Sequence, residues 1–140
     1  MKRDYQNKKF KSEVKKFYSL KGRNLFRDVH SKGIKIQDRN IRVYFLKFSD
    51  YSKKNSLISK DHGNLKFGIS LNKKFGKAYK RNKARRRIRN ICYMLLKEMN
   101  EGFYIILRPE KGFLEIPFEE ELLIVRKLFA RARMLKNNVD

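Results

Sequence analysis

The sequence contains one cysteine and no long apolar segment. Cys92 alone cannot form an internal disulfide or a cysteine metal cluster. The longest apolar runs, such as 103–107 and 122–125, fall far short of the roughly eighteen residues that a membrane-spanning helix needs. The N-terminus has no continuous apolar stretch, so it does not look like a secretory signal. These absences, and the lack of repeats or a Pro/Gly linker, favour one soluble, cytoplasmic domain over residues 1–140.

Acidic residues are scarce. The chain carries 37 Lys and Arg against 14 Asp and Glu, which gives a formal net charge of +23 on 140 residues. Such a charge repels itself, and a polyanion relieves the repulsion through neutralisation and counterion release. Hydrophobic residues make up 41% of the chain, which suits a globular core better than a disordered tail or a helix on a membrane surface. Nucleic acid is therefore the predicted class of partner, and no membrane is expected.

A catalytic group of residues is also missing. We find no paired carboxylates in a plausible site and no nucleophile spaced with a base. His30 and His62 are isolated in the sequence. We interpret His62 as a surface residue and His30 as part of an apolar helix face, with a role in a binding cleft as the alternative. Cys92 is expected in the core of a helix. We predict no catalytic residue and no metal site on the protein.

Hydrophobic periodicity predicts three helices and three strands. The helices are expected at about 24–32, at about 77–99 and from 117 onward. The strands are expected at 41–48, 65–71 and 103–108. The order helix, strands, helix, strand, helix predicts an α+β fold, a two-layer α–β sandwich with its core in residues 20–133. Residues 1–19 read as a basic arm, either a mobile terminus or an RNA contact, and 49–64 as a polar connection.

Faces of these elements can also be assigned. On the first strand Ile41, Val43 and Phe45 should share one face, with Arg42 and Tyr44 on the other. The predicted apolar stripe of the long helix consists of Ala84, Ile88, Ile91, Cys92, Leu95 and Met99. The predicted buried face of the last helix consists of Leu122, Val125, Leu128, Phe129 and Ala132, after acidic residues in its first turn.

The segment 73–89 carries the functional signal. Ten of its seventeen residues are basic and none is acidic. A charge run is usually a solvated helix face, but at about 100° per residue Lys77 and Arg81 lie in line with the stripe that begins at Ala84. Arg residues four apart, such as Arg81 and Arg85, repel each other unless phosphates lie between them. Arginine grips two phosphate oxygens at once, so we predict that this segment binds phosphates.

The string GISLNKKFGKAYKRNKARRRIRN, residues 68–90, resembles the signature of the bacterial ribonuclease P protein subunit. In that family a strand leads into Ser-x-x-Lys-Lys-x-Gly-x-Ala and then into an Arg-Asn-rich helix. Residues 20–33 are similar to the family's first helix, and 103–109 to its last strand. The resemblance covers about residues 20–133. Lys83 stands where Arg is common, Ala84 where a larger aliphatic is usual, and His30 where an aromatic such as Phe is expected.

The resemblance implies a role in tRNA processing. In that family a catalytic RNA subunit with bound Mg²⁺ acts as the endoribonuclease that removes the 5′ leader of precursor tRNA, and the protein is not the catalyst. The fold would contain a left-handed βαβ crossover. The residues expected to bind the RNA subunit are Lys73, Lys74, Lys77, Arg81, Asn82, Lys83, Arg85, Arg86 and Arg89. The residues expected to line the cleft for the single-stranded leader are Phe26, His30, Arg42, Tyr44, Lys66 and Ser70.

Two other interpretations remain open at this point. One is a stand-alone structural RNA-binding protein of the ribosome-associated type, and the other is a DNA-coating protein. Composition alone does not separate them, whereas the signature favours the ribonuclease P subunit. Its partners would be the catalytic RNA and precursor tRNA, with no protein partner implied.

Overall fold

The computed structural model describes residues 19–49 and 65–136. Residues 1–18 of the predicted arm, most of the connection 49–64, and His62 lie outside this part of the chain. The helices are α2 (Arg23–Lys32), α4 (Ala78–Leu95) and α5 (Phe118–Arg131), and the strands are β1 (Ile34–Asp38), β2 (Ile41–Lys47), β3 (Lys66–Ile69) and β4 (Phe103–Pro109). Three short 3-10 helices, η2 (Lys73–Phe75), η3 (Leu96–Glu98) and η4 (Phe113–Glu115), lie between these elements.

The four strands form one mixed sheet in the order β1-β2-β4-β3. β1 pairs with β2, and β2 with β4, in antiparallel fashion, whereas β3 and β4 are parallel. Parallel neighbours need a crossover, and α4 supplies it. β3, α4 and β4 thus form the βαβ unit for which the resemblance implies a left-handed crossover.

The prediction of three strands was incomplete, because it missed β1. This strand has only five residues, and none of them is fully buried. Its alternation is limited to Ile34 and Ile36, too short a pattern to stand out from a loop. Pairing with β2, from Ile34 opposite Phe45 to Asp38 opposite Ile41, makes it a strand.

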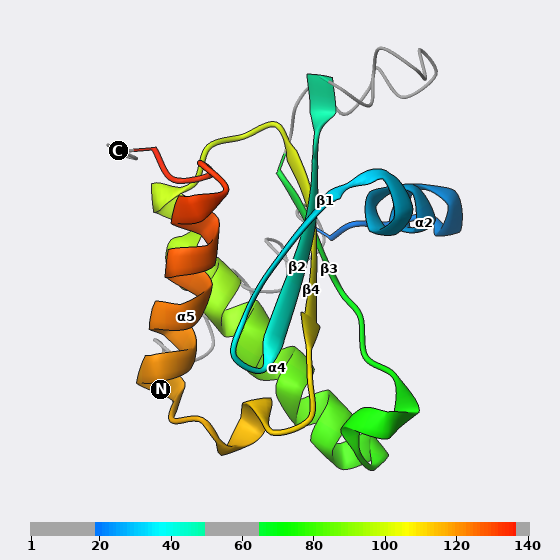
Figure 1. Cartoon of the computed structure of the whole chain (residues 1–140), viewed down its shortest axis with the longest axis vertical. Coiled ribbons are helices and arrows are strands. Elements are labelled where there is room, and N and C mark those ends of the chain that lie inside the picture. The colour runs from blue at the N-terminus through cyan, green and yellow to red at the C-terminus, as the bar shows by residue number, and fades with distance from the viewer. Residues whose placement is uncertain (1–18, 50–64, 137–140) are drawn as a thin grey trace, which may run out of the picture.

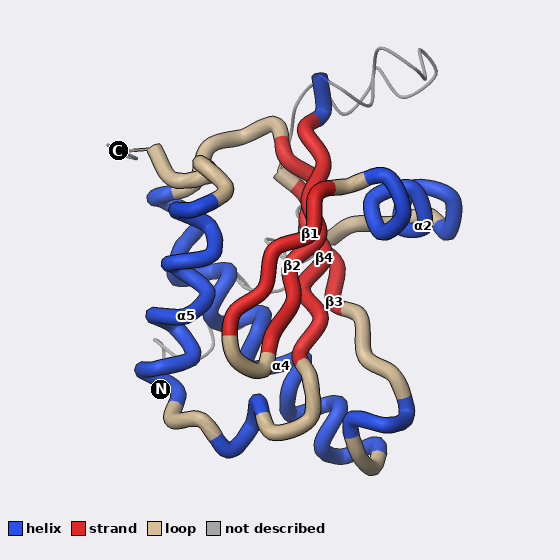
Figure 2. The backbone as a smooth tube through the Cα atoms, viewed as in Figure 1, coloured by secondary structure: helices blue, strands red, loops and turns tan. Residues whose placement is uncertain are grey.

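Helices cover both faces of the sheet. α4 and α5 lie on one face and α2 on the other (Figures 1 and 2). Val43 and Phe45 join the larger core under α4 and α5, while Tyr44 joins a smaller core with Val29 of α2. The predicted α+β fold is confirmed. The sheet with α4 and α5 forms the main two-layer sandwich, and α2 packs on the opposite face because β2 and β4 are apolar on both sides.

The predicted stripe of the long helix is confirmed. Ala84, Ile88, Ile91, Cys92 and Leu95 are the buried residues of α4, and Met99 is buried just after it. On α5 the prediction was partly wrong. Val125, Leu128 and Phe129 are buried as expected, but the buried set also includes Ile124 and the carboxylate Glu121.

Gly33 ends α2, with its N–H donating to the Val29 carbonyl at 3.0 Å. Its φ of −72° is open to any residue. Glycine is needed there because an added Cβ would lie 2.7 Å from the Phe45 carbonyl oxygen. Across residues 19–49 and 65–136, no helix is both long and apolar enough to cross a bilayer.

Candidate nucleic-acid interface

A tight turn between β3 and α4 positions the basic segment. The Asn72 side chain accepts a hydrogen bond from the Phe75 N–H at 3.2 Å, and the Phe75 ring is buried. Gly76 follows with φ +152°, a conformation that favours glycine. Arg81 Nη1 donates to the Gly76 carbonyl at 2.7 Å and ties the first turn of α4 back to this turn. Local hydrogen bonds therefore set the direction in which α4 leaves the sheet.

The first turns of α4 carry cations beyond the core. They extend past the end of the sheet in Figure 1, and the first buried residue of the helix is Ala84. The helix has no acidic residue in its first turn and no side-chain cap at Lys77. Basic residues can therefore occupy positions in line with the stripe, because the core does not reach the start of the helix.

The nine predicted RNA-subunit contacts share one continuous segment from η2 through α4. Arg81, Arg85 and Arg89 are half-buried, and the other six are exposed. Within the described part of the chain, none of the nine forms an ion pair with a carboxylate. Their charges are left for an external anion.

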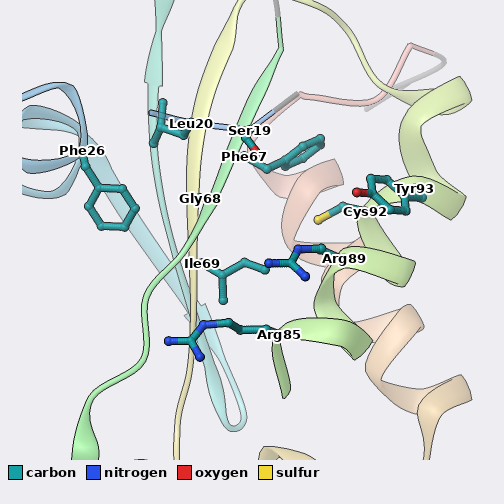
Figure 3. Close-up of a pocket in the computed structure, with 10 residues that line it drawn as sticks. All are labelled: Ser19, Leu20, Phe26, Phe67, Gly68, Ile69, Arg85, Arg89, Cys92 and Tyr93. Atoms are coloured by element: carbon teal, nitrogen blue, oxygen red, sulfur yellow. The ribbon is translucent and has the colours of Figure 1, made fainter. Parts of the chain in front are cut away.

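One side of α4 faces the edge strand β3 across a pocket of about 190 Å³. Arg85 and Arg89 point toward β3 from α4, and Phe26 approaches from α2 on the other side of the strand (Figure 3). The remaining lining residues are Ser19, Leu20, Phe67, Gly68, Ile69, Cys92 and Tyr93. The pocket joins the basic helix to the α2 side of the sheet, a connection that spacing along the sequence did not reveal.

The predicted leader cleft is only partly assembled under α2. Phe26 is half-buried, and the exposed His30 ring lies 4.4 Å from the Tyr44 ring, centroid to centroid. Tyr44 is 6% exposed and belongs to the core, and Val29 is fully buried. His30 was interpreted as part of an apolar helix face, and it lies one turn from Phe26 on α2, although its side chain is exposed. Its ring covers Tyr44 from the solvent side.

Gly68 lies where the Phe26 side chain of α2 reaches β3. A Cβ at this position would stand 2.6 Å from Phe26 Cε2 and 3.2 Å from Leu20 Cδ2. Glycine therefore lets the Phe26 ring rest against β3. Phe26 and His30 also line a second, open groove along α2, together with Leu20, Gly22, Arg23, Arg27 and Ser31. Arg23 and Arg27 were missed by sequence reasoning, which had assigned no role to the outer side of this helix.

Arg42 lies at the other end of this face, opposite Arg108 on β4. Its Nε is 3.0 Å from Glu110 Oε1, and Arg108 Nε is 3.9 Å from the same oxygen. Arg42, which was expected to line the cleft, is thus paired with a carboxylate, and Arg108 is a cation on this face that the sequence reasoning did not assign. Ser70, whose N–H donates to the Leu107 carbonyl at 2.9 Å, lies near this end, while Lys66 begins β3 opposite Tyr104. The six predicted cleft residues are therefore spread along the face.

Arg87 turns to the other side of α4 and has an internal partner. Its Nη1 donates to Glu121 Oε2 of α5 at 3.0 Å and to the Leu114 carbonyl at 3.2 Å. The Glu121 side chain is fully buried, and its Oε1 has no hydrogen-bond partner among the described residues. Burial raises the pKa of the Glu121 carboxyl, and the Arg87 charge opposes that rise. Glu121 was predicted only as a favourable charge for the helix dipole, but it holds α5 against α4.

Breaking this pair from one side should destabilise the fold. Arg87→Met leaves the Glu121 carboxylate buried without its cation, so we expect the free energy of unfolding to fall by about 2–3 kcal/mol. Adding Glu121→Leu removes the unpaired charge and should recover most of that loss. Urea denaturation of the wild type, the two single variants and the double variant measures the coupling. Additive losses would show that the two side chains act independently.

Among residues 19–49 and 65–136, no three His, Cys, Asp or Glu side chains gather closely enough to hold a metal ion. Cys92 is buried in the core of α4, as predicted, and burial raises the pKa of its thiol. What the described surface offers is cations and aromatic rings. The outer edge of β3 is partly paired, because the Leu20 N–H donates to the Phe67 carbonyl at 2.6 Å.

Comparison with known proteins adds an independent line of evidence. The family model described as Ribonuclease P matches residues 14–133. The ribonuclease P protein component of Symbiobacterium thermophilum is 31% identical over 123 residues, which covers 88% of this chain and 97% of the relative. That of Carboxydothermus hydrogenoformans is 34% identical over 110 residues, covering 76% of this chain and 86% of the relative.

Solved structures show the same fold. A Staphylococcus aureus RNase P protein mutant with defective mRNA degradation activity superposes with a TM-score of 0.71 at 23% identity, covering 89% of this chain and 96% of that one. The RNase P protein from Thermotoga maritima gives 0.65 at 26% identity, covering 81% and 96%. The agreement extends over the sheet and helices that carry the basic segment.

Proposed function

The chain belongs to the ribonuclease P protein component family, which has a role in tRNA processing, and from that membership we propose that it is the RNA-binding subunit of this ribonucleoprotein. It would bind a catalytic RNA that removes the 5′ leader from precursor tRNA. The RNA would perform the cleavage, and the protein would hold the RNA and the leader. Mg²⁺, held mainly by the RNA, would supply the charge stabilisation that phosphodiester cleavage needs.

The observation that carries this proposal is the unpaired cationic surface of η2 and α4. Its residues before Ala84 project beyond the core, its later ones flank the buried stripe, and none of the nine has a carboxylate partner in the described part of the chain. Such a surface suits the phosphates of an RNA, because each Arg or Lys that neutralises a phosphate releases condensed counterions from the RNA. We propose that this surface binds the catalytic RNA.

We further propose that the leader lies along α2. Phe26 and His30 offer ring surfaces that can stack on a base of any identity. Tyr44 supports His30 from below at 4.4 Å rather than meeting a base itself. Ser70, Arg42 and Arg108 lie toward one end of the same face and Lys66 toward the other, and the backbone of a longer leader would pass along this face. The pocket beside β3 offers a path from this groove to Arg85 and Arg89.

An activity assay tests the proposal as a whole. We expect the purified chain, added to a bacterial ribonuclease P RNA, to accelerate precursor tRNA cleavage at low Mg²⁺. The acceleration should shrink as Mg²⁺ is raised, because the divalent ion then screens the phosphates that the +23 protein neutralises. The measurement is the single-turnover cleavage rate across a Mg²⁺ titration. No acceleration at any Mg²⁺ concentration would refute the assignment.

A further inference from the structure

The outward face of α4 carries an aromatic ring that the proposed phosphate contacts do not explain. Tyr79, Asn82, Lys83 and Arg86 stand at i, i+3, i+4 and i+7, so they share one helix face. All four are exposed, and we call them the Tyr79 ridge. Ala84 begins the buried stripe on the opposite side of the helix. The ridge therefore points to solvent, away from the core.

Other basic side chains of α4 face different directions. Arg81 is held by the Gly76 carbonyl, and Arg87 by Glu121. Arg85 lines the pocket beside β3, where its Nη1 also donates to Asn82 Oδ1 at 3.1 Å. This last bond orients the Asn82 side chain and leaves its amide N–H groups available at the ridge. The ridge is thus a surface distinct from the β3 pocket and from the contact with α5.

Tyr79 is the most exposed large hydrophobic side chain in residues 19–49 and 65–136, at 64%. The structure gives it no hydrogen bond and no ring contact in that part of the chain. Its neighbours on the ridge are Lys83 and Arg86, and no carboxylate lies in the first turn of the helix. Phosphates alone would be bound by the cations and would leave the ring in water. A flat apolar partner that also carries phosphates would use both.

We propose that the Tyr79 ridge binds an unpaired nucleotide of the catalytic RNA. The base stacks on the Tyr79 ring, the flanking phosphates meet Lys83 and Arg86, and the Asn82 amide donates to a base or sugar oxygen. A duplex would bury its bases and present only phosphates, so the ridge selects a bulge or single-stranded loop. This inference rests on the proposed function, since it identifies the kind of RNA element that the basic segment recognises.

The test compares three substitutions at Tyr79 with a control on the same helix. We expect Tyr79→Ala to raise the Kd for a bacterial ribonuclease P RNA about fivefold to a hundredfold, because one stacked base is lost. Tyr79→Phe should bind like the wild type, and Tyr79→Leu should lose affinity like Tyr79→Ala. Met94→Ala, which truncates a side chain that is 55% exposed, should leave the Kd unchanged.

Salt dependence separates stacking from charge. Tyr79→Ala should leave the slope of log Kd against log salt unchanged, whereas Arg86→Ala should reduce that slope by about 0.7–0.9. An unchanged Kd for Tyr79→Ala, or full affinity for Tyr79→Leu, would overturn the stacking site while RNA binding by the wild type stands. If the wild type itself does not bind the RNA, the proposed function fails instead.

Discussion

Replacing Arg81, Arg85 and Arg89 together with alanine is expected to weaken binding to the catalytic RNA about a hundredfold at about 0.15 M salt. Each of these arginines that meets a phosphate contributes about 0.7–0.9 to the salt slope, so the slope should fall by about 2–3. Arg85 and Arg89 line the pocket beside β3, and Arg81 precedes Arg85 by one helical turn. None of the three is paired with a carboxylate in the described residues. Their loss therefore removes contacts to the RNA rather than internal ion pairs.

The measurement is the Kd for the RNA at several salt concentrations, with a charge-matched control. Replacing the exposed Lys97, Lys111 and Lys127 with alanine also removes three positive charges, but from positions outside η2 and α4. The control should keep nearly the full slope. Equal slopes for the two triple variants would mean that net charge, and not the α4 surface, governs binding.

One of the three arginines also has an internal role. Because Arg81 holds the Gly76 carbonyl, its removal loosens the turn before α4 as well. The double variant Arg85→Ala/Arg89→Ala avoids this effect. It should reduce the slope by about 1.4–1.8, two thirds of the change in the triple variant.

The second large effect is expected at α2. Removing both rings with Phe26→Ala and His30→Ala should reduce the preference of the assembled complex for precursor over mature tRNA by about fivefold to a hundredfold. The stacking surface for the leader is lost, while the catalytic RNA still meets α4. Affinity for mature tRNA, which has no leader, should not change.

The discriminating quantity is the ratio of the two dissociation constants, measured on the assembled ribonucleoprotein. His30→Ala alone leaves the core under α2 intact, because His30 is exposed, and should give part of the loss. Ile34→Ala truncates a side chain that is 60% exposed on β1, outside the groove, and serves as the control. Equal loss of affinity for both tRNAs in the α2 variants would place Phe26 and His30 outside the leader path.

Periodicity predicted the elements whose burial repeats along the chain. The apolar stripe of α4 begins at Ala84 in the structure as in the sequence, and the two faces of β2 separate at Phe45 and Tyr44 as expected. These features are local, since each residue's face follows from its position in a helix or strand. The short strand β1 was not predicted, because two isoleucines are too few to establish an alternating pattern. Its strand character comes from pairing with β2.

Ion-pair partners that are distant in the sequence could not be predicted from periodicity. Arg87 and Arg86 are adjacent members of one basic run, yet Arg87 meets Glu121, 34 positions away, while Arg86 is exposed. Arg42 likewise meets Glu110. Periodicity states which side of an element is buried, but not which element packs there.

The charge, the basic segment and its signature could therefore be predicted from the sequence, because they depend on residue type and spacing alone. Which cations are free for RNA was decided by the packing of α5 on α4 and of β2 beside β4. That packing brings carboxylates to Arg87 and Arg42 and leaves the Tyr79 ridge in solvent. Long-range contacts of this kind arise only when the chain has folded.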